Sequence, residues 1–234
     1  MRKPILFIAL LILIGAGIFL YSYKGGALLK TVFADKNVSE GVIEYQVTYP
    51  KLEPGNPMAT FLPDKAYLHF KDDKMVTEMS GLMFRISYIS NQSSSSVEQT
   101  FALLGQKKVS DISAKELKKL NGSFLTSIEK GTKTKAIAGF ACKEALVKLK
   151  SGESIQVFYT NDIGINNPNW SNPYTKIDGV LMDFQLESYG LFMHLTANKV
   201  LPESVEDSSF DVSKDHTKIP FSELEEMLRT TVAN

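Results

Sequence analysis

The chain has 234 residues, of which 44% are hydrophobic and 22% are charged, and its 26 basic side chains are balanced by 26 acidic ones. A chain of this length can bury a core of its own, and it carries no net charge that would attract a polyanion. Nucleic acid is therefore excluded as an expected partner. A single cysteine also excludes an intramolecular disulfide.

Residues 1–23 predict a membrane anchor. Arg2 and Lys3 precede an uncharged run from Pro4 to Tyr23, and about 20 helical residues span about 30 Å, the thickness of the hydrocarbon core of a bilayer. The alternative is a signal peptide cleaved near Ala34, although the apolar region of a signal peptide is usually only about 7–15 residues long. Basic residues before the run favour an N-terminus in the cytoplasm.

The expected location follows from this anchor. Single-pass insertion in the inner membrane would leave the bulk of the chain extracytoplasmic, in the periplasm, whereas cleavage near Ala34 would release a secreted protein. Residues 24–37, with a Gly-Gly pair and no clear period, are interpreted as a tether. Residues 38–234 are expected to form one β-rich extracytoplasmic domain.

Alternation of apolar and polar side chains predicts strands through most of that domain. In the segment GVIEYQVTYP, Ile43, Tyr45 and Val47 fall on one face, and a two-residue period is typical of a half-buried strand. Segments 97–105 and 191–200 continue the strand pattern, and turns are expected at 71–74, 91–96, 151–153 and 189–190. Further side chains expected to face inward are Ala66, Leu68, Phe70, Leu82, Phe84, Ile86, Tyr88, Val147, Leu149, Ile155, Val157, Tyr159, Val180, Met182, Phe184 and Leu186.

Two capping boxes predict short helices. Ser113 is followed three residues later by Glu116, and Ser222 by Glu225, the spacing at which the two residues satisfy each other's backbone amides at the start of a helix. Many antiparallel strands with two short helices indicate a mainly β (α+β) fold, a curved antiparallel sheet or half-barrel. A helix across the open sheet would cover its apolar face. The expected apolar positions of the helices are Leu117, Leu120, Leu224 and Leu228.

No residue pattern points to catalysis, a metal site or a cofactor. Cys142 has no second thiol and no histidine beside it in sequence, so it is interpreted as a buried small apolar residue and not as a nucleophile. His69 and His194 occupy outward strand positions, without the close spacing of zinc ligands. The glycine motifs of phosphate and dinucleotide sites, and the G-x-S-x-G motif of hydrolases, are missing from the sequence.

The loop GINNPNWSNPY contains the strongest candidates for a partner or ligand contact, Trp170 and Tyr174. An aromatic side chain on a loop can anchor a partner, or Trp170 can fold back and plug the open end of the sheet, which burial favours by about 1.5–3 kcal/mol. A group of methionines raises the same alternative between an adaptable apolar cavity and ordinary core packing: Met75, Met79, Met83, Met182 and Met193.

The stretch 135–164 resembles the strand pair of an uncharacterised family of bacterial envelope proteins, domain of unknown function 4412, which is related to the GLPGLI proteins. The resemblance extends from about Val38 to Val200, but residues 177–182 depart from the GLPGLI signature itself. It implies a fold similar to the periplasmic lipoprotein carriers, with a hollow able to take an acyl chain, and it implies no catalytic residue. The matching elements are Ile137-Ala138-Gly139, Cys142-Lys143, Tyr159-Thr160 and Asp162-Ile163.

Three functions are compatible with these features. The first is a membrane-anchored envelope domain that binds a lipid or other apolar ligand in the hollow of the sheet without transforming it. The second is a protein–protein interaction or assembly module that uses the Trp170 loop. The third is an envelope hydrolase, which is disfavoured because no nucleophile, metal set or acid–base pair is recognisable.

Overall fold

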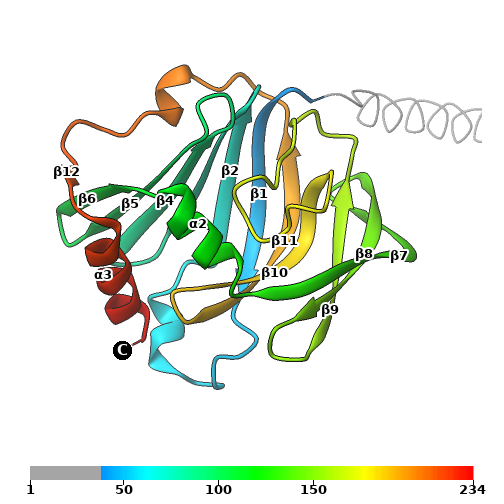
Figure 1. Cartoon of the computed structure of the whole chain (residues 1–234), viewed down its shortest axis with the longest axis horizontal. Helices are drawn as coiled ribbons and strands as arrows, with labels where there is room; N and C mark the ends of the chain where they lie inside the picture. Colours follow the sequence, from blue (N-terminus) through cyan, green and yellow to red (C-terminus); the bar gives the residue numbers. More distant parts are fainter. Residues whose placement is uncertain (1–37, 234) are drawn as a thin grey trace, which may run out of the picture. The chain divides into compact units, whose positions relative to one another are not determined.

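Alternating side chains build one large sheet in the computed structural model of the chain, which describes residues 38–233 (Figure 1). The sheet has twelve strands in the order β12-β6-β5-β4-β3-β2-β1-β11-β10-β9-β8-β7 and is not closed. The strands are β1 (Glu40–Thr48), β2 (Lys65–Lys71), β3 (Lys74–Ser80), β4 (Phe84–Asn91), β5 (Ser96–Leu103), β6 (Gln106–Asp111), β7 (Leu125–Ile137), β8 (Phe140–Leu149), β9 (Ser154–Thr160), β10 (Val180–Ser188), β11 (Leu191–Leu201) and β12 (Thr217–Lys218). The mainly β, curved-sheet prediction is confirmed for the described residues.

The sheet consists of two antiparallel meanders joined at their first and last strands. Strands β1 to β6 pair in sequence order, as do β7 to β11. Pairing of β1 with β11 connects the two halves, so that Ile43 lies between Leu68 on β2 and Val200 on β11. Within the described part of the chain, β12 contributes the one parallel pairing, with β6 at the edge. The hollow of the sheet therefore collects side chains from distant parts of the sequence.

Within residues 38–233, two α-helices accompany the sheet, α2 (Ala114–Asn121) and α3 (Phe221–Ala233). The capping box of α2 is confirmed, because the Glu116 amide donates to Ser113 Oγ at 3.3 Å and the Ser113 amide donates to Glu116 Oε2 at 2.8 Å. The second capping box is wrong. Helix α3 begins at Phe221, so Ser222 already lies inside it, and Glu225 accepts from the Arg229 guanidinium instead.

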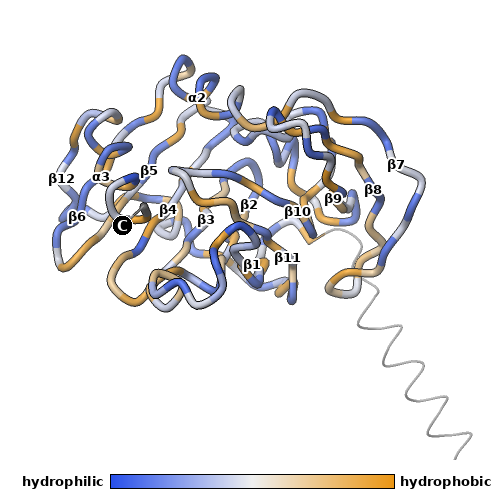
Figure 2. Tube along the Cα trace, turned by 90° about the horizontal axis from the view of Figure 1, so that it is seen from below, coloured by the Kyte–Doolittle hydropathy of each residue, from blue (hydrophilic) through white to orange (hydrophobic). Residues whose placement is uncertain are grey.

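Helix α2 and the loop 161–179 lie over one face of the sheet, in front of the strands in Figure 1 and above them in Figure 2. Leu117 and Leu120 of α2 pack with Trp170 of the loop around Val97, Ile112 and Phe221. Leu224 and Leu228 of α3 are fully buried beside Phe84 and Phe101, as their helical spacing predicts. Figure 2 shows apolar and polar residues alternating along the strands beneath this cover.

Most of the side chains that were predicted to point inward are buried, with one clear exception. Leu82 was expected to point inward from a strand, but it is 73% exposed and lies in the turn before β4. Strands β3, β6, β7 and β12 were not predicted as strands. The predicted inward side chains that are buried are Ile43, Tyr45, Val47, Ala66, Phe70, Phe84, Ile86, Val147, Leu149, Val157, Tyr159, Val180 and Met182.

The chain divides into two units, Met1–Lys36 and Asn37–Asn234. The predicted membrane anchor (1–23) and tether (24–37) lie outside the described residues. Among residues 38–233, neither helix has the length and hydropathy needed to cross a bilayer.

Candidate ligand-binding site

A cavity of about 420 Å³ lies in the hollow of the sheet. Its walls come from β1 to β5, from β10 and β11, from the ends of α2 and α3, and from residues 168–174 of the covering loop. A volume of about 300–1,000 Å³ is typical of small-molecule sites in proteins. Because the sheet is open, the two helices and the loop are needed to enclose this space.

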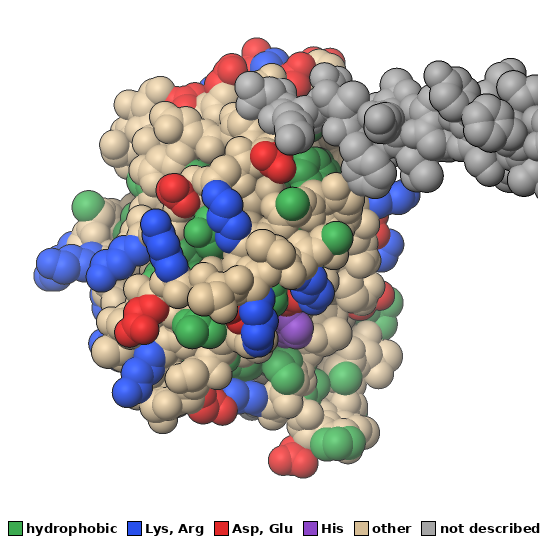
Figure 3. Space-filling view, turned by 90° about the vertical axis from the view of Figure 1, so that its right-hand side faces the viewer, with side chains coloured by type: hydrophobic (Ala, Val, Ile, Leu, Met, Phe, Trp, Pro, Cys, Tyr) green, Lys and Arg blue, Asp and Glu red, His purple; other side chains and the backbone are tan. Residues whose placement is uncertain are grey.

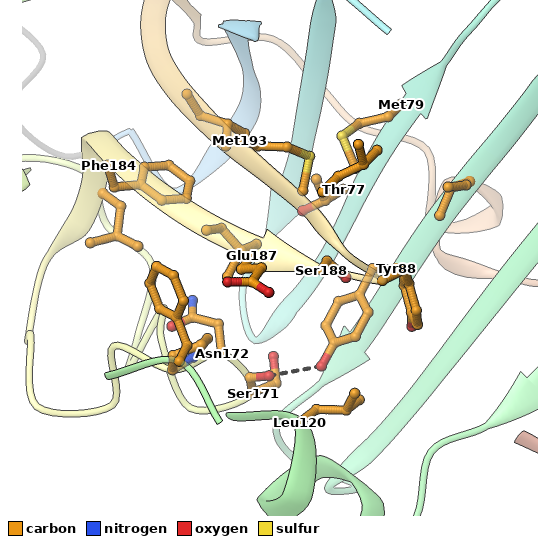
Figure 4. Close-up of a pocket in the computed structure, with 18 of the residues that line it drawn as sticks. Thr77, Met79, Tyr88, Leu120, Ser171, Asn172, Phe184, Glu187, Ser188 and Met193 are labelled. Atoms are coloured by element: carbon orange, nitrogen blue, oxygen red, sulfur yellow. Dashed lines mark hydrogen bonds between the residues drawn. The ribbon is translucent and has the colours of Figure 1, made fainter. Parts of the chain in front are cut away.

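The wall formed by the middle strands is apolar. Leu68, Met75 and Met79 face the cavity from β2 and β3, and Leu186 and Met193 face it from β10 and β11. Figure 4 shows Met79 and Met193 next to each other beside Thr77, at one end of the cavity. Methionine has a flexible, polarisable side chain that adapts to irregular apolar shapes. This wall can therefore accept an apolar ligand without a fixed outline.

The methionines divide between the two roles expected of them. Met75, Met79 and Met193 line the cavity. Met182 is fully buried in the core, whereas Met83 is 44% exposed in the turn before β4. The alternation of side chains on each strand decides which methionine reaches the hollow.

A polar row crosses the other side of the cavity. Strand register places Gln99 of β5 opposite Tyr88 of β4, and Tyr88 opposite Thr77 of β3, while Thr77 lies opposite Leu68. The first three line the cavity, and Gln99 is only 3% exposed. A buried polar side chain requires hydrogen-bond partners. The cavity thus has one row of polar side chains across β3 to β5, with apolar side chains of β3 and β4 on either side of it, and is apolar toward β2, β1 and β11.

Two hydrogen bonds cross the hollow and hold its cover. The Tyr189 hydroxyl, from the turn between β10 and β11, donates to Gln99 Oε1 on β5. The Tyr88 hydroxyl donates to the Ser171 carbonyl of the covering loop at 2.7 Å, the bond drawn in Figure 4. Burial raises the pKa of both phenols above the usual value of 10.0. Both hydroxyls therefore remain neutral donors at physiological pH.

Charges at the rim are balanced. The Arg229 guanidinium of α3 donates to Glu225 Oε1 through Nε at 3.2 Å and through Nη2 at 2.9 Å. Lys119 Nζ lies 3.8 Å from the same carboxyl group, and the exposed Glu187 also lines the cavity. The lining itself thus holds one cation, Arg229, and one anion, Glu187, while Glu225 pairs with Arg229 and Lys119 outside the lining. The rim does not select strongly for a charged ligand.

Trp170 and Tyr174, the candidate contact residues from the sequence, occupy different positions. Tyr174 is fully buried and lines the cavity, with its ring edge-on to Phe184 at 6.0 Å between centroids. Trp170 is half-buried and packs against two core clusters, and its indole nitrogen is buried without an acceptor among residues 38–233. Asn169 anchors the loop by donating to the carbonyls of Ile177 and Gly179 at 2.8 and 2.9 Å.

Cys142 lies in the core, away from the cavity wall. It is fully buried, and its thiol donates to the Phe140 carbonyl at 3.5 Å. Burial raises the pKa of the Cys142 thiol to about 11, which keeps the sulfur protonated and unreactive. These features agree with its interpretation as a packing residue.

The histidines pair with carboxylates. His194 Nε2 lies 2.6 Å from Asp183 Oδ1, and Lys135 Nζ lies 2.8 Å from the other oxygen of that carboxyl group. Burial of Asp183 acts to raise its pKa, but these two hydrogen bonds outweigh burial and hold the pKa below the usual range. His69 lies 4.0 Å from Glu78. In the described part of the chain, no group of three or more such residues is placed to hold a metal ion.

Sequence reasoning missed the polar row. Gln99 interrupts the apolar face of segment 97–103, where Val97, Phe101 and Leu103 stand at the other inward positions. A polar residue at such a position is a signal that could have been used. Tyr189 had no comparable signal, because it lies 90 positions after Gln99 in the sequence and contacts it only in the folded sheet.

No known protein family and no curated protein sequence matches this chain. Its function is therefore argued from the cavity itself.

Proposed function

We propose that the protein is a membrane-anchored envelope protein whose β-domain binds a lipid or other apolar ligand in the hollow of its sheet. The observation that carries this proposal is the cavity of about 420 Å³ with its methionine-rich wall. Filling such a cavity with an apolar ligand removes apolar surface from water and gains about 25 cal/mol per Å² of that surface. The proposal includes no chemical step.

The covering loop supports a small ligand over a protein partner. Tyr174 is fully buried and its amide donates to Asn172 Oδ1 at 2.8 Å, so the loop is fixed by its own polar side chains. A partner protein would reach Tyr174 only after this loop had opened. We therefore assign the loop to the wall of the ligand site and retain the interaction module as the weaker alternative.

Location and family are part of the same proposal. The uncharged run 4–23 supports insertion in the inner membrane, with the β-domain in the periplasm. The resemblance to the GLPGLI-related envelope proteins, and through them to lipoprotein carriers, supports a role in holding a lipid. A fold resemblance is weaker warrant for function than the cavity is.

Recovery of bound lipid tests the proposal. We would purify the full-length chain from membranes, extract it with organic solvent and identify the released lipids by mass spectrometry. Leu186→Trp places a larger side chain in the cavity, whereas Leu146→Trp makes the same change on β8 at a position that is 42% exposed. We expect stoichiometric lipid from the wild type and Leu146→Trp, and little from Leu186→Trp.

Equal recovery from all three folded proteins would contradict the proposal, as would repeated isolation of empty wild type. Folding of each variant is checked by circular dichroism, since a β-rich spectrum must be retained for the comparison to count.

A further inference from the structure

We propose that the ligand is an acyl compound, and that its carbonyl-type oxygen accepts a hydrogen bond from the side-chain amide of Gln99. This inference rests on the proposed function and specifies the class and orientation of the ligand. It is carried by one polar residue of the cavity lining, Gln99, an almost fully buried amide whose nitrogen donates to no acceptor among the described residues.

Gln99 has hydrogen-bonding capacity that the protein does not use. Its side chain lines the cavity at 3% exposure, and its Oε1 accepts from the Tyr189 hydroxyl. The amide nitrogen Nε2 carries two N–H donors, yet neither donates to an acceptor among residues 38–233. Nε2 is not among the fully buried side-chain atoms that lack a partner in residues 38–233, so this nitrogen is accessible from the cavity. An acceptor oxygen on the ligand would satisfy this donor.

The neighbouring side chains restrict that acceptor to the Gln99 end of the cavity. The Tyr88 hydroxyl is already donated to the Ser171 carbonyl, and the Tyr189 hydroxyl to Gln99 itself. Gln99 therefore keeps two unused N–H donors at this end of the cavity, and we place the ligand's oxygen there; Thr77 and Ser90, which also line the cavity, offer a single hydroxyl donor each. The ligand needs an acceptor and gains little from a donor of its own.

The register of the strands indicates the direction in which the acyl chain of the ligand would extend. From Gln99 the row runs through Tyr88 and Thr77 to Leu68 on β2, three strand spacings or about 14 Å away. Met193 and Leu195 of β11 line the cavity beyond. An acyl chain with its oxygen at Gln99 would therefore extend across β4 and β3 toward β2, β1 and β11.

The charge of the head group is not decisive at this site. The cavity lining holds one cation, Arg229, which is paired with Glu225, and one anion, Glu187, so neither a carboxylate nor a neutral ester is strongly favoured. Free fatty acids and acyl esters share the same acceptor oxygen. The test below includes both, together with an alkane that lacks any acceptor.

Photolabelling of the full-length chain in lipid nanodiscs tests the proposal. Three probes carry a diazirine at the far end of a dodecyl chain: the carboxylic acid, its methyl ester and the corresponding alkane. Labelled peptides are quantified by mass spectrometry in the wild type, in Gln99→Leu and in the control Gln156→Leu, which changes an exposed glutamine on β9. Comparing each variant with the wild type cancels the partition of each probe into the bilayer.

We expect the acid and the ester to label the wild type more than the alkane does, with the label on peptides from β2 and β11. Gln99→Leu should reduce this preference about 3- to 10-fold, the range for loss of one neutral hydrogen bond, while Gln156→Leu should leave it unchanged. Gln99→Leu also leaves the Tyr189 hydroxyl without its acceptor. The double variant Gln99→Leu/Tyr189→Phe removes both partners, a change that is nearly neutral for stability, and should lose the preference equally.

The outcomes separate the two proposals. If no probe labels peptides of the cavity, the proposed ligand-binding function fails. If the alkane labels the cavity of the wild type as strongly as the acid and the ester, or if the preference survives both Gln99 variants, the acyl assignment is overturned while the apolar site stands. Preference for the acid alone, or for the ester alone, supports the assignment and identifies the source of the acyl group.

Discussion

Tyr45 offers a test of how deeply the interior of the sheet is sealed from water. Its side chain is 3% exposed, its ring lies edge-on to Phe184 at 5.8 Å, and its hydroxyl donates to the Leu181 carbonyl at 2.9 Å. Burial raises its pKa above the usual 10.0. Tyr45→Phe removes the hydroxyl and keeps the ring, so it isolates the hydrogen bond and the titration from packing.

Two contributions of opposite sign follow from this substitution. Below pH 10 the variant loses the hydrogen bond from the Tyr45 hydroxyl to the Leu181 carbonyl, which should lower the free energy of unfolding by about 1 kcal/mol. Above pH 10 the unfolded tyrosine ionises while the folded one retains its proton. The ionisation of Tyr45 in the unfolded chain therefore lowers the free energy of unfolding of the wild type by about 1.4 kcal/mol per pH unit. The Tyr45→Phe variant has no hydroxyl to ionise and shows no such loss.

The difference between the two proteins should consequently depend on pH. We expect the wild type to be more stable by about 1 kcal/mol at pH 8, and the two proteins to be about equal at pH 11, where about 1.4 kcal/mol has been lost. Urea unfolding, followed by the fluorescence of Trp170, the only tryptophan, measures both values. Tyr67→Phe, at a half-buried position on β2, serves as the control.

A constant difference between wild type and Tyr45→Phe from pH 8 to pH 11 would refute this reasoning. It would mean that the Tyr45 hydroxyl ionises as freely in the folded protein as in the unfolded chain. The hollow would then admit water at its inner wall, and its suitability for an apolar ligand would fall with it.

Three further substitutions address the loop, the cysteine and the edge of the sheet. Trp170→Ala should lower the free energy of unfolding by about 2–3 kcal/mol, less than for a fully buried ring. Trp170→Phe should lower it by under about 1 kcal/mol, because this change also removes an unpaired N–H. Equal effects of the two variants in urea unfolding would contradict the interpretation that Trp170 plugs the open end of the sheet. Cys142→Ala should lower the free energy of unfolding by about 1 kcal/mol. In the wild type, Cys142 should react with a thiol reagent only as the protein unfolds. Fast labelling of the folded protein would disprove the burial of Cys142. Gly131→Ala would place a Cβ 2.4 Å from Glu144 Cγ and displace a carboxylate that accepts hydrogen bonds from two backbone amides at 3.1 Å. We expect the free energy of unfolding to fall by about 2–4 kcal/mol. A stability within about 0.5 kcal/mol of the wild type in thermal unfolding would show that this contact does not form.

Local patterns in the sequence determined the elements whose stability is itself local. Alternation placed Ile43, Tyr45 and Val47 on one face, because a strand with one buried side needs an apolar residue at every second position. The first capping box located the start of α2, because its two hydrogen bonds join residues only three positions apart. Both features can be identified without knowing what the segment packs against.

Strand β7 and the start of α3 depended on their surroundings. Strand β7 is an edge strand, largely exposed and rich in lysine and threonine, with register shifts against β8, so it shows no alternation to detect. At α3, the Glu223 and Leu224 amides donate to the Pro220 carbonyl, and the Ser222–Glu225 spacing matched a capping box by coincidence. In both cases, interactions with adjacent residues or strands determined where the element lies, and the local sequence pattern did not.

The cavity was decided by tertiary structure alone. Its walls run from Tyr45 to Val232, and the Tyr189–Gln99 bond that spans it joins two residues that no sequence pattern links. The sequence by itself determined that these strands have an apolar side. Whether the two meanders meet in a solid core or leave a hollow depends on the register of β1 with β11 and on how the loop and helices cover the open sheet, and these arise from packing between distant segments.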